Sequence, residues 1–172
     1  GPYKLGITSS RALKGMWSES GGTVIEIDGI TANSCLVSVG EWNHIAFSKE
    51  SGSANLYLNG EDCTGSCSGG SCGSTATIDT STIDLSIGKD QGSWGGFEGK
   101  IDEIQLFSEA YGAGEVLDLF MDTGRQLQAF YPLGDRVAKD YSGNGFDGAV
   151  NGGGLVTTMN RKRQNMKATY FD

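Results

Sequence analysis

The chain has 172 residues, with 21 Asp and Glu residues against 13 Lys and Arg residues and a formal net charge of −8. This length supports one domain with a substantial hydrophobic core. The acidic balance disfavours nucleic acid as a partner, because binding it requires clustered Lys and Arg. No apolar run reaches the roughly 20 residues that span a bilayer, so we expect no membrane insertion.

The first half of the chain alternates apolar and polar residues, which predicts short β-strands with one buried face. Residues 23–27 and 35–39 flank a polar turn, and we expect them to pair as a hairpin. Residues 42–48 and 55–58 are predicted as the next two strands, joined by turn residues at 50–53. The 28 glycines and two prolines fit many tight turns between short strands.

Trp42 and His44 share one face of the strand predicted at residues 42–48. We expect Trp42 to pack in or near the core, with His44 hydrogen-bonded beside it, rather than His44 to act as a general base. No nucleophile-elbow motif accompanies them. This pair is therefore predicted to be structural.

The second half of the chain predicts one helix among further strands. Residues 108–122 form the helix, and Gly124 follows it where a C-terminal cap belongs. The apolar stripe of the helix consists of Val116, Leu117, Leu119 and Phe120. Further strands are predicted at residues 83–87, 101–107, 129–133 and 168–172.

The four cysteines form an even set in a loop-rich β chain, which favours disulfides and an oxidising, extracytoplasmic setting. A zinc site is the alternative, but the sequence has no paired C-x-x-C units and its one histidine lies elsewhere. Four cysteines allow three pairings, and the sequence does not decide among them. We prefer Cys67 with Cys72 at the loop tip, which leaves Cys35 for Cys63.

Three motifs and a helix follow one another in a recognisable order. They are Gly-x-Trp-x-His-Ile-Ala at 40–46, Leu-Tyr-Leu-Asn-Gly at 56–60, Gly-x-Ile-Asp-Glu-Ile at 99–104, and the helix ending at Phe120. With these motifs the chain resembles the laminin-G-like, concanavalin-A-like lectin and glucanase superfamily. The resemblance implies an all-β fold: a two-sheet antiparallel jelly-roll sandwich with one short helix. It also implies a secreted or cell-surface location, since members occur in adhesins, lectins and accessory modules of glycan-degrading enzymes.

The order of the segments departs from this family. Residues 1–125 resemble the C-terminal part of the family pattern, whereas residues 126–172 resemble its opening. Either the chain is a circular permutation that folds as one sandwich, or it spans the end of one tandem domain and the start of the next. In the second case, open sheet edges would need strands from a neighbour. We favour a single sandwich over residues 1–172.

Acidic and amide side chains surround a Gly-rich turn near the C-terminus. Asp140, Asn144 and Asp147 offer oxygen atoms at short spacing, which suits calcium and its roughly six to eight oxygen ligands. The family resemblance adds Asp102 as a distant ligand. The alternative is a turn in which these side chains cap their own backbone. We expect a structural calcium ion.

The resembling family also contains glycoside hydrolases, which need two carboxylates flanking the scissile bond. Asp102 and Glu103 are adjacent, so they point to opposite faces of a strand, and Glu98 has no partner at the right spacing. No other predicted strand carries two acids on one face. We therefore expect no enzymatic activity.

Exposed aromatic rings are the expected recognition groups, because the C–H faces of sugars stack on them. Trp17, Trp94 and Phe97 are the candidates, although Trp94 could instead fold over the sandwich as a lid. Candidate hydrogen-bonding partners on loops are Asn33, Asp90 and Gln91.

These features together predict a non-catalytic extracellular binding or adhesion module, stabilised by calcium, whose partner is a glycan or an extracellular protein. The alternative is a structural repeat of an extracellular filament or sheath that self-assembles through its terminal strands.

Overall fold

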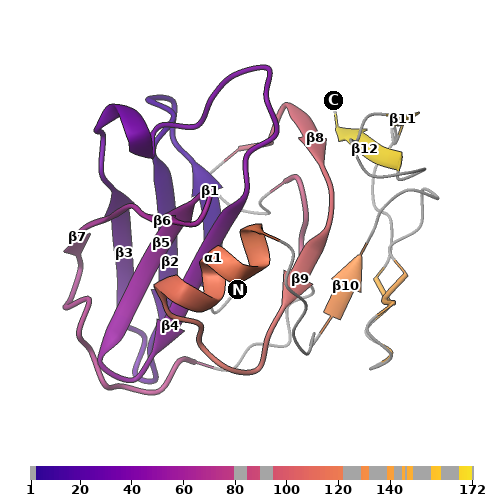
Figure 1. The fold of residues 1–172 in the computed structure, drawn as a ribbon. Coiled ribbons are helices and arrows are strands. Elements are labelled where there is room, and N and C mark those ends of the chain that lie inside the picture. Colours follow the sequence, from indigo (N-terminus) through magenta and orange to yellow (C-terminus); the bar gives the residue numbers. More distant parts are fainter. Residues whose placement is uncertain are drawn as a thin grey trace. The chain divides into compact units, whose positions relative to one another are not determined.

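The computed structural model describes residues 3–79, 85–89, 95–121, 129–131, 139–141, 145, 147–148, 156–159 and 167–171. Within them the fold is all-β and antiparallel with one short α-helix, as the sequence predicts (Figure 1). The chain divides into two compact units. Unit 1 comprises residues 1–84 and 109–125, and unit 2 comprises residues 85–108 and 126–172.

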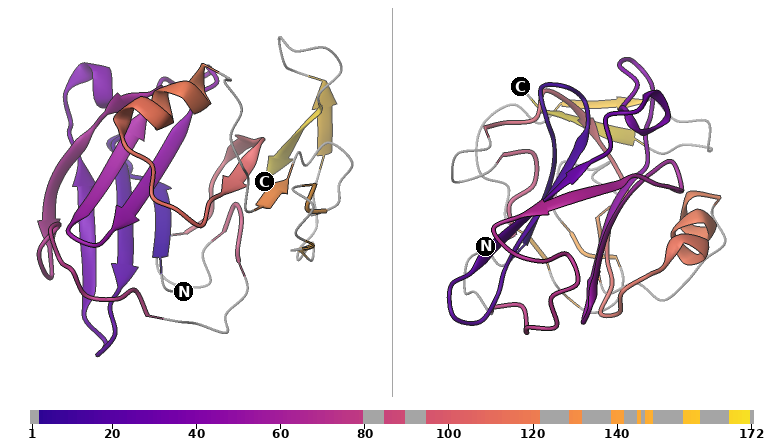
Figure 2. Two further views of the ribbon diagram at one scale, coloured as in Figure 1. Left: turned by 60° about the horizontal axis from the view of Figure 1, so that its bottom comes forward. Right: turned by 90° about the vertical axis from the view of Figure 1, so that its left-hand side faces the viewer.

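Unit 1 contains two antiparallel sheets, whose strands can be followed from two further sides in Figure 2. The first sheet, in the order β1-β2-β3-β7, is formed by β1 (Tyr3–Ile7), β2 (Leu13–Ser18), β3 (Val24–Gly29) and β7 (Thr64–Ser68). The second sheet, in the order β4-β5-β6, is formed by β4 (Ile45–Glu50), β5 (Ser53–Leu58) and β6 (Glu61–Asp62). The two-sheet sandwich expected from the sequence is confirmed.

The core of unit 1 lies between these sheets and is centred on Trp17. This side chain is fully buried on the inner face of β2, and its ring centroid lies 6.1 Å from that of Phe47 on β4. Gly15 makes room for the contact, since a Cβ there would lie 3.2 Å from Phe47 ring atoms. The other fully buried apolar side chains alternate along β2, β3 and β5, as expected for inner faces: Leu13, Ile25, Ile27, Leu56 and Leu58.

Helix α1 (Ala113–Phe120) lies across the outer face of the second sheet (Figure 1). Val116 is its buried residue, and Tyr57 of β5 is buried although its side chain points away from the core between the sheets. Burial raises the pKa of the Tyr57 hydroxyl, and nearby carboxylates add to the shift. Gly60, at a φ of +83°, allows a close approach: a Cβ there would lie 2.8 Å from Cδ1 of Leu117.

Unit 2 pairs β-strands from two distant parts of the chain. β8 (Gly99–Ile101) pairs with β12 (Lys167–Phe171), which pairs in turn with β11 (Val156–Met159). β9 (Ile104–Leu106) pairs with β10 (Ala129–Tyr131), and the buried Tyr131 packs against the apolar residues of β8 and β9. The segment that resembles the family's opening thus adds its strands to β8 and β9.

The hairpin predicted for residues 23–27 and 35–39 is wrong. β3 pairs with β2 and β7, whereas residues 33–35 form a short 3₁₀ helix, η1 (Asn33–Cys35). Several strands, among them β2, β7 and β11, were not predicted from the sequence. Glycine and serine interrupt the apolar alternation of β2 and β7. Local patterns also do not specify which distant strand will be the partner.

Other strand boundaries also differ from the prediction. The strand expected at 42–48 begins at Ile45. The strand expected at 101–107 is divided between β8 and β9, where Glu103 adopts a φ of +51°. Residues 85–87 are not in a strand, and residues 83–84 lie outside the described residues.

Candidate functional site

The ligand loop predicted from the sequence is described only in part. Trp94, Asp90 and Gln91 lie outside the described residues, as does the side chain of Asn33. Phe97 is 36% exposed, and its backbone N–H donates to the carbonyl of Gly88 at 2.8 Å. Among these candidates the described structure places only the Phe97 side chain, so this ligand loop stays a prediction.

Two of the four predicted calcium ligands meet in one turn. Oδ1 of Asp147 accepts the backbone N–H of Asp140 at 2.9 Å, and Oδ2 lies 3.5 Å from Nζ of Lys139. Oδ1 of Asp102 accepts the backbone N–H of Glu103 at 2.9 Å. Asn144 lies outside the described residues. Within the described part of the chain, no three acidic, His or Cys side chains gather to hold a metal ion. The described residues thus fit a side-chain-capped turn, and calcium stays a prediction.

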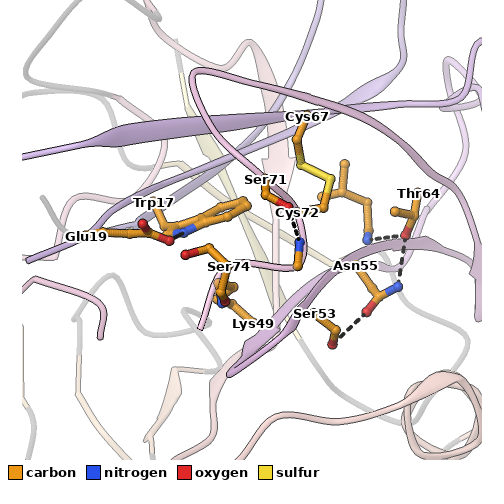
Figure 3. The surroundings of a disulfide bond; sticks show 12 residues. Trp17, Glu19, Lys49, Ser53, Asn55, Thr64, Cys67, Ser71, Cys72 and Ser74 are labelled. Atoms are coloured by element: carbon orange, nitrogen blue, oxygen red, sulfur yellow. Dashed lines mark hydrogen bonds between the residues drawn. A yellow bond between two sulfur atoms is a disulfide. The ribbon is translucent and has the colours of Figure 1, made fainter. Parts of the chain in front are cut away.

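Trp17 is not a recognition residue, because it is enclosed by the core and by a polar cluster beside the Cys67–Cys72 disulfide (Figure 3). Its Nε1 donates to Oε1 of the buried Glu19 at 3.0 Å. Nζ of Lys49 lies 5.4 Å from the Trp17 ring centroid and donates to the Ser74 carbonyl at 3.1 Å. Hydrogen bonding to the Ser74 side chain, followed by that from Trp17, lowers the pKa of Glu19. This cluster is structural.

The two disulfides join Cys35 to Cys63 and Cys67 to Cys72, which is the pairing preferred from the sequence. All four cysteines are therefore oxidised, and none is left as a zinc ligand. Cys35 and Cys63 are buried in the core of unit 1, whereas Cys67–Cys72 closes a short loop after β7. Disulfides persist in oxidising compartments, so both bonds favour an extracytoplasmic setting.

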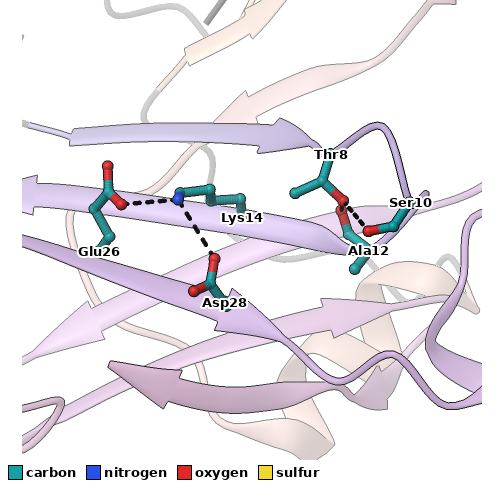
Figure 4. A network of polar contacts seen from close by, with 6 residues as sticks. All are labelled: Thr8, Ser10, Ala12, Lys14, Glu26 and Asp28. Atoms are coloured by element: carbon teal, nitrogen blue, oxygen red, sulfur yellow. Dashed lines mark hydrogen bonds and ion pairs between the residues drawn. The ribbon is translucent and has the colours of Figure 1, made fainter. Parts of the chain in front are cut away.

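Glu26 and Asp28 share the outer face of β3, so the prediction that no other strand carries two acids on one face is wrong. The strand extends to Gly29, so both side chains alternate with buried isoleucines. Nζ of Lys14 lies 2.8 Å from Oε2 of Glu26 and 3.5 Å from Oδ1 of Asp28 (Figure 4). The hydrogen bond to Glu26 is the main cause that raises the pKa of Lys14. These acids form an ion-pair network, whereas a glycosidase holds one carboxyl group protonated.

An exposed apolar surface lies on residues 39–42 and on the C-terminal end of α1. The exposed fractions are 81% for Val39, 42% for Trp42, 46% for Leu117, 43% for Phe120 and 65% for Met121. We name these five residues the Trp42 surface. The prediction that Trp42 packs in or near the core is therefore wrong. Large apolar side chains grouped on a soluble domain mark interaction sites.

Residues beside the loop contact the helix. The ring centroids of His44 and Phe120 lie 5.9 Å apart. The backbone N–H of His44 donates to Oδ1 of Asn59 at 2.8 Å, and the following Gly60 lies against Leu117 and Phe120. The exposed residues of α1 and its C-cap are spaced i, i+3 and i+4, so they share one helix face. The two parts of the Trp42 surface are thus held at one end of the second sheet.

The side chain of Asn43 holds the loop that carries Trp42. Its Oδ1 accepts the backbone N–H of Ser38 at 3.1 Å, and its Nδ2 donates to the carbonyls of Ser38 and Glu41 at 2.9 and 3.0 Å. A loop with these internal hydrogen bonds is already ordered, so binding to it costs less conformational entropy. The loop therefore presents Trp42 and Val39 in a preformed arrangement.

Sequence reasoning missed this surface because it assigned the apolar helix residues to one buried stripe. Val116 is buried and Leu119 is half-buried, but Leu117 and Phe120 are exposed. The helix has only eight residues, and its apolar residues cover more than the face that meets the sheet. Met121 lay outside the predicted stripe, but Val39 lay in the strand predicted at 35–39, so no pattern in the sequence joined these two residues to Trp42.

A family model described as the concanavalin A-like lectin/glucanases superfamily matches residues 1–117, and the chain belongs to this superfamily. A solved S-layer domain-containing protein (residues 221–444) from Clostridium thermocellum matches the chain with 19% sequence identity and a TM-score of 0.40. The match covers 68% of this chain and 61% of that chain. No curated protein matches the chain. Among the described residues, no helix is long and apolar enough to cross a membrane.

Proposed function

We propose that the chain is a non-catalytic binding module of a secreted or cell-surface protein, with a glycan or an extracellular protein as its partner. Membership of the superfamily and the two disulfides support this function. The observation that carries it is the Trp42 surface, which combines exposed apolar side chains with an ordered loop. Such a surface gains free energy when a partner covers it.

The acidic residues on β3 support a non-catalytic role. Glu26 and Asp28 share one ammonium group, that of Lys14, and their side chains are 36% and 52% exposed. A general acid for glycoside cleavage needs an environment that keeps it protonated, such as an apolar pocket. An exposed ion-pair network on the outer face of a sheet does not supply one.

Binding to a glycan array and to an array of secreted proteins tests this function. We expect a defined partner, whose binding weakens in Trp42→Ser and is unchanged in Val24→Ser. Val24 is a matched control, because it is 46% exposed on the outer face of the other sheet. Cleavage of a polysaccharide that is lost in Glu26→Gln or Asp28→Asn would contradict the proposal.

The second candidate function is a structural repeat that assembles through its terminal strands. Thr169 opposes Ile101 and Phe130 opposes Gln105, so strands of the C-terminal segment pair with partners far away in the sequence. The same edges could accept the equivalent strands of a neighbouring copy. Head-to-tail polymers without binding on either array would favour this function, and a monomer at high concentration would count against it.

A further inference from the structure

The chain's negative charge is concentrated in unit 1, which carries the Trp42 surface. Residues 1–84 and 109–125 contain 13 Asp and Glu residues and five Lys and Arg residues, so this unit accounts for the whole formal charge of −8. Unit 2 contains eight residues of each sign and is formally neutral. A partner that docks on unit 1 therefore meets a strongly negative surface potential.

The segments that carry the Trp42 surface, and the segment at 57–62 that contacts them, contain carboxylates and no Lys or Arg. Residues 38–44, 57–62 and 113–121 hold five acidic residues: Glu41, Glu61, Asp62, Glu115 and Asp118. Their field acts on a buried neighbour, because Asp62 and Glu115 both add to the raised pKa of Tyr57. Glu41 and Asp118 are the chain neighbours of Trp42 and Leu117, and Glu61 follows Gly60, which lies against Leu117 and Phe120. Carboxylates therefore adjoin the apolar side chains of the Trp42 surface.

We propose that the Trp42 surface docks a basic amphipathic segment of a partner protein, whose apolar side chains cover Val39, Trp42 and Met121 and whose Lys or Arg residues face the surrounding carboxylates. This inference rests on the proposed binding function and specifies its partner. Apolar burial supplies affinity, and the opposite charges raise the association rate and set the orientation.

The charge of unit 1 favours this partner over a second copy, and the side chains of the Trp42 surface favour it over a sugar. Two acidic units would repel each other across a shared interface. The surface also offers aliphatic Val39, Leu117 and Met121 beside its two aromatic rings, whereas a sugar site combines aromatic rings with several hydrogen-bonding groups. An amphipathic helix laid on an apolar face is an established mode of peptide recognition.

The probe is a synthetic amphipathic peptide of Leu and Lys, about five helical turns long, titrated into the whole chain by calorimetry. The indole N–H signal of Trp42 in an NMR spectrum reports where it binds. We expect Val39→Ser/Met121→Ser to weaken binding by about tenfold or more, because two apolar contacts are lost. Val24→Ser/Ile30→Ser, which removes two exposed apolar side chains of unit 1 outside this surface, should leave binding unchanged.

Two further comparisons test the role of charge. Glu41→Gln/Glu61→Gln should weaken binding, and Glu26→Gln/Glu50→Gln, which changes two acids of unit 1 outside this surface, should weaken it less. A peptide with Glu in place of Lys should not bind, and binding of the Lys peptide should weaken as salt is added. A peptide with the same composition but scattered Leu residues should bind more weakly, because it lacks an apolar face.

Equal affinity for wild type and Val39→Ser/Met121→Ser would overturn the inference, since binding would then depend on charge alone. Self-association that is lost in this double variant would also overturn it, by assigning the surface to a second copy. A defined glycan ligand without peptide binding would overturn the inference and leave the proposed binding function intact.

Discussion

At the scale of single residues, Trp17 and Trp42 have opposite environments. Trp17 is fully buried between the two sheets of unit 1, whereas Trp42 is 42% exposed on a hydrogen-bonded loop. The sequence analysis assigned them the reverse roles, because Trp42 lies in the family-like motif and in a predicted strand. β2, which buries Trp17, was not recognised from its pattern. The position of a tryptophan therefore depended on strand partners that are distant in the sequence.

Alanine substitutions test this assignment. Trp17→Ala should lower the free energy of unfolding by about 3–5 kcal/mol, because it leaves a large cavity in the core. Trp42→Ala should lower it by less than about 1 kcal/mol, since the side chain is largely exposed. Urea denaturation of both variants measures the two values. A larger loss for Trp42→Ala than for Trp17→Ala would contradict the described core.

Glu19 makes the stability of the fold depend on pH. Its folded pKa lies below the ordinary value of 4.5, chiefly through hydrogen bonding to Ser74 and Trp17. The unfolded state therefore binds more protons in this range, and the free energy of unfolding should fall as pH decreases below about 4.5. Glu19→Gln should be less stable than wild type at pH 7 and should show a smaller decrease on acidification. Parallel slopes for the two proteins would contradict this role.

At the scale of elements, the two disulfides should contribute unequally. Cys35 and Cys63 are 28 residues apart and Cys67 and Cys72 are five apart, so the first closes the longer loop of the unfolded chain. Chain entropy predicts contributions of about 3.5 and 2 kcal/mol, respectively. Thermal denaturation of Cys35→Ala/Cys63→Ala and Cys67→Ala/Cys72→Ala measures the difference. The opposite order would show that the short loop carries more of the fold than its length implies.

The acidic turn near the C-terminus offers a test of its hydrogen bond and of calcium together. Asp147→Ala removes the acceptor of the Asp140 N–H and should cost about 1 kcal/mol. If the carboxylate acts only as this hydrogen-bond acceptor, the loss is the same with calcium and with excess chelator, because a hydrogen bond needs no metal. A loss that appears only with calcium would show that the carboxylate acts as a metal ligand, as the sequence predicts.

At the scale of the whole molecule, the sequence predicted the fold class but not all the pairings. The strands β5 and β12 were recognisable because apolar residues alternate in them, as Leu56 and Leu58 do in β5. β11 was not predicted. β7 was hidden in a Gly- and Ser-rich segment that reads as a loop. The Trp42 surface could not be predicted, since exposure of Phe120 and Met121 depends on how far α1 covers the second sheet.

The unusual order of the segments has a counterpart in the strand pairing of unit 2. The C-terminal segment, which resembles the family's opening, pairs with β8 and β9 from the Gly-x-Ile-Asp-Glu-Ile motif. Antiparallel pairing depends on register and side-chain pattern and not on chain order. Strands that stand in an unusual order along the chain can therefore still pair with one another.

The central claim, that the two sheets of unit 1 bury Trp17 and leave Trp42 presented for binding, can be tested by hydroxyl-radical footprinting with mass spectrometry on the native chain. We predict rapid oxidation of Trp42 and protection of Trp17 until the protein is denatured. Rapid oxidation of Trp17, or protection of Trp42 to the level of a core residue, would contradict the account.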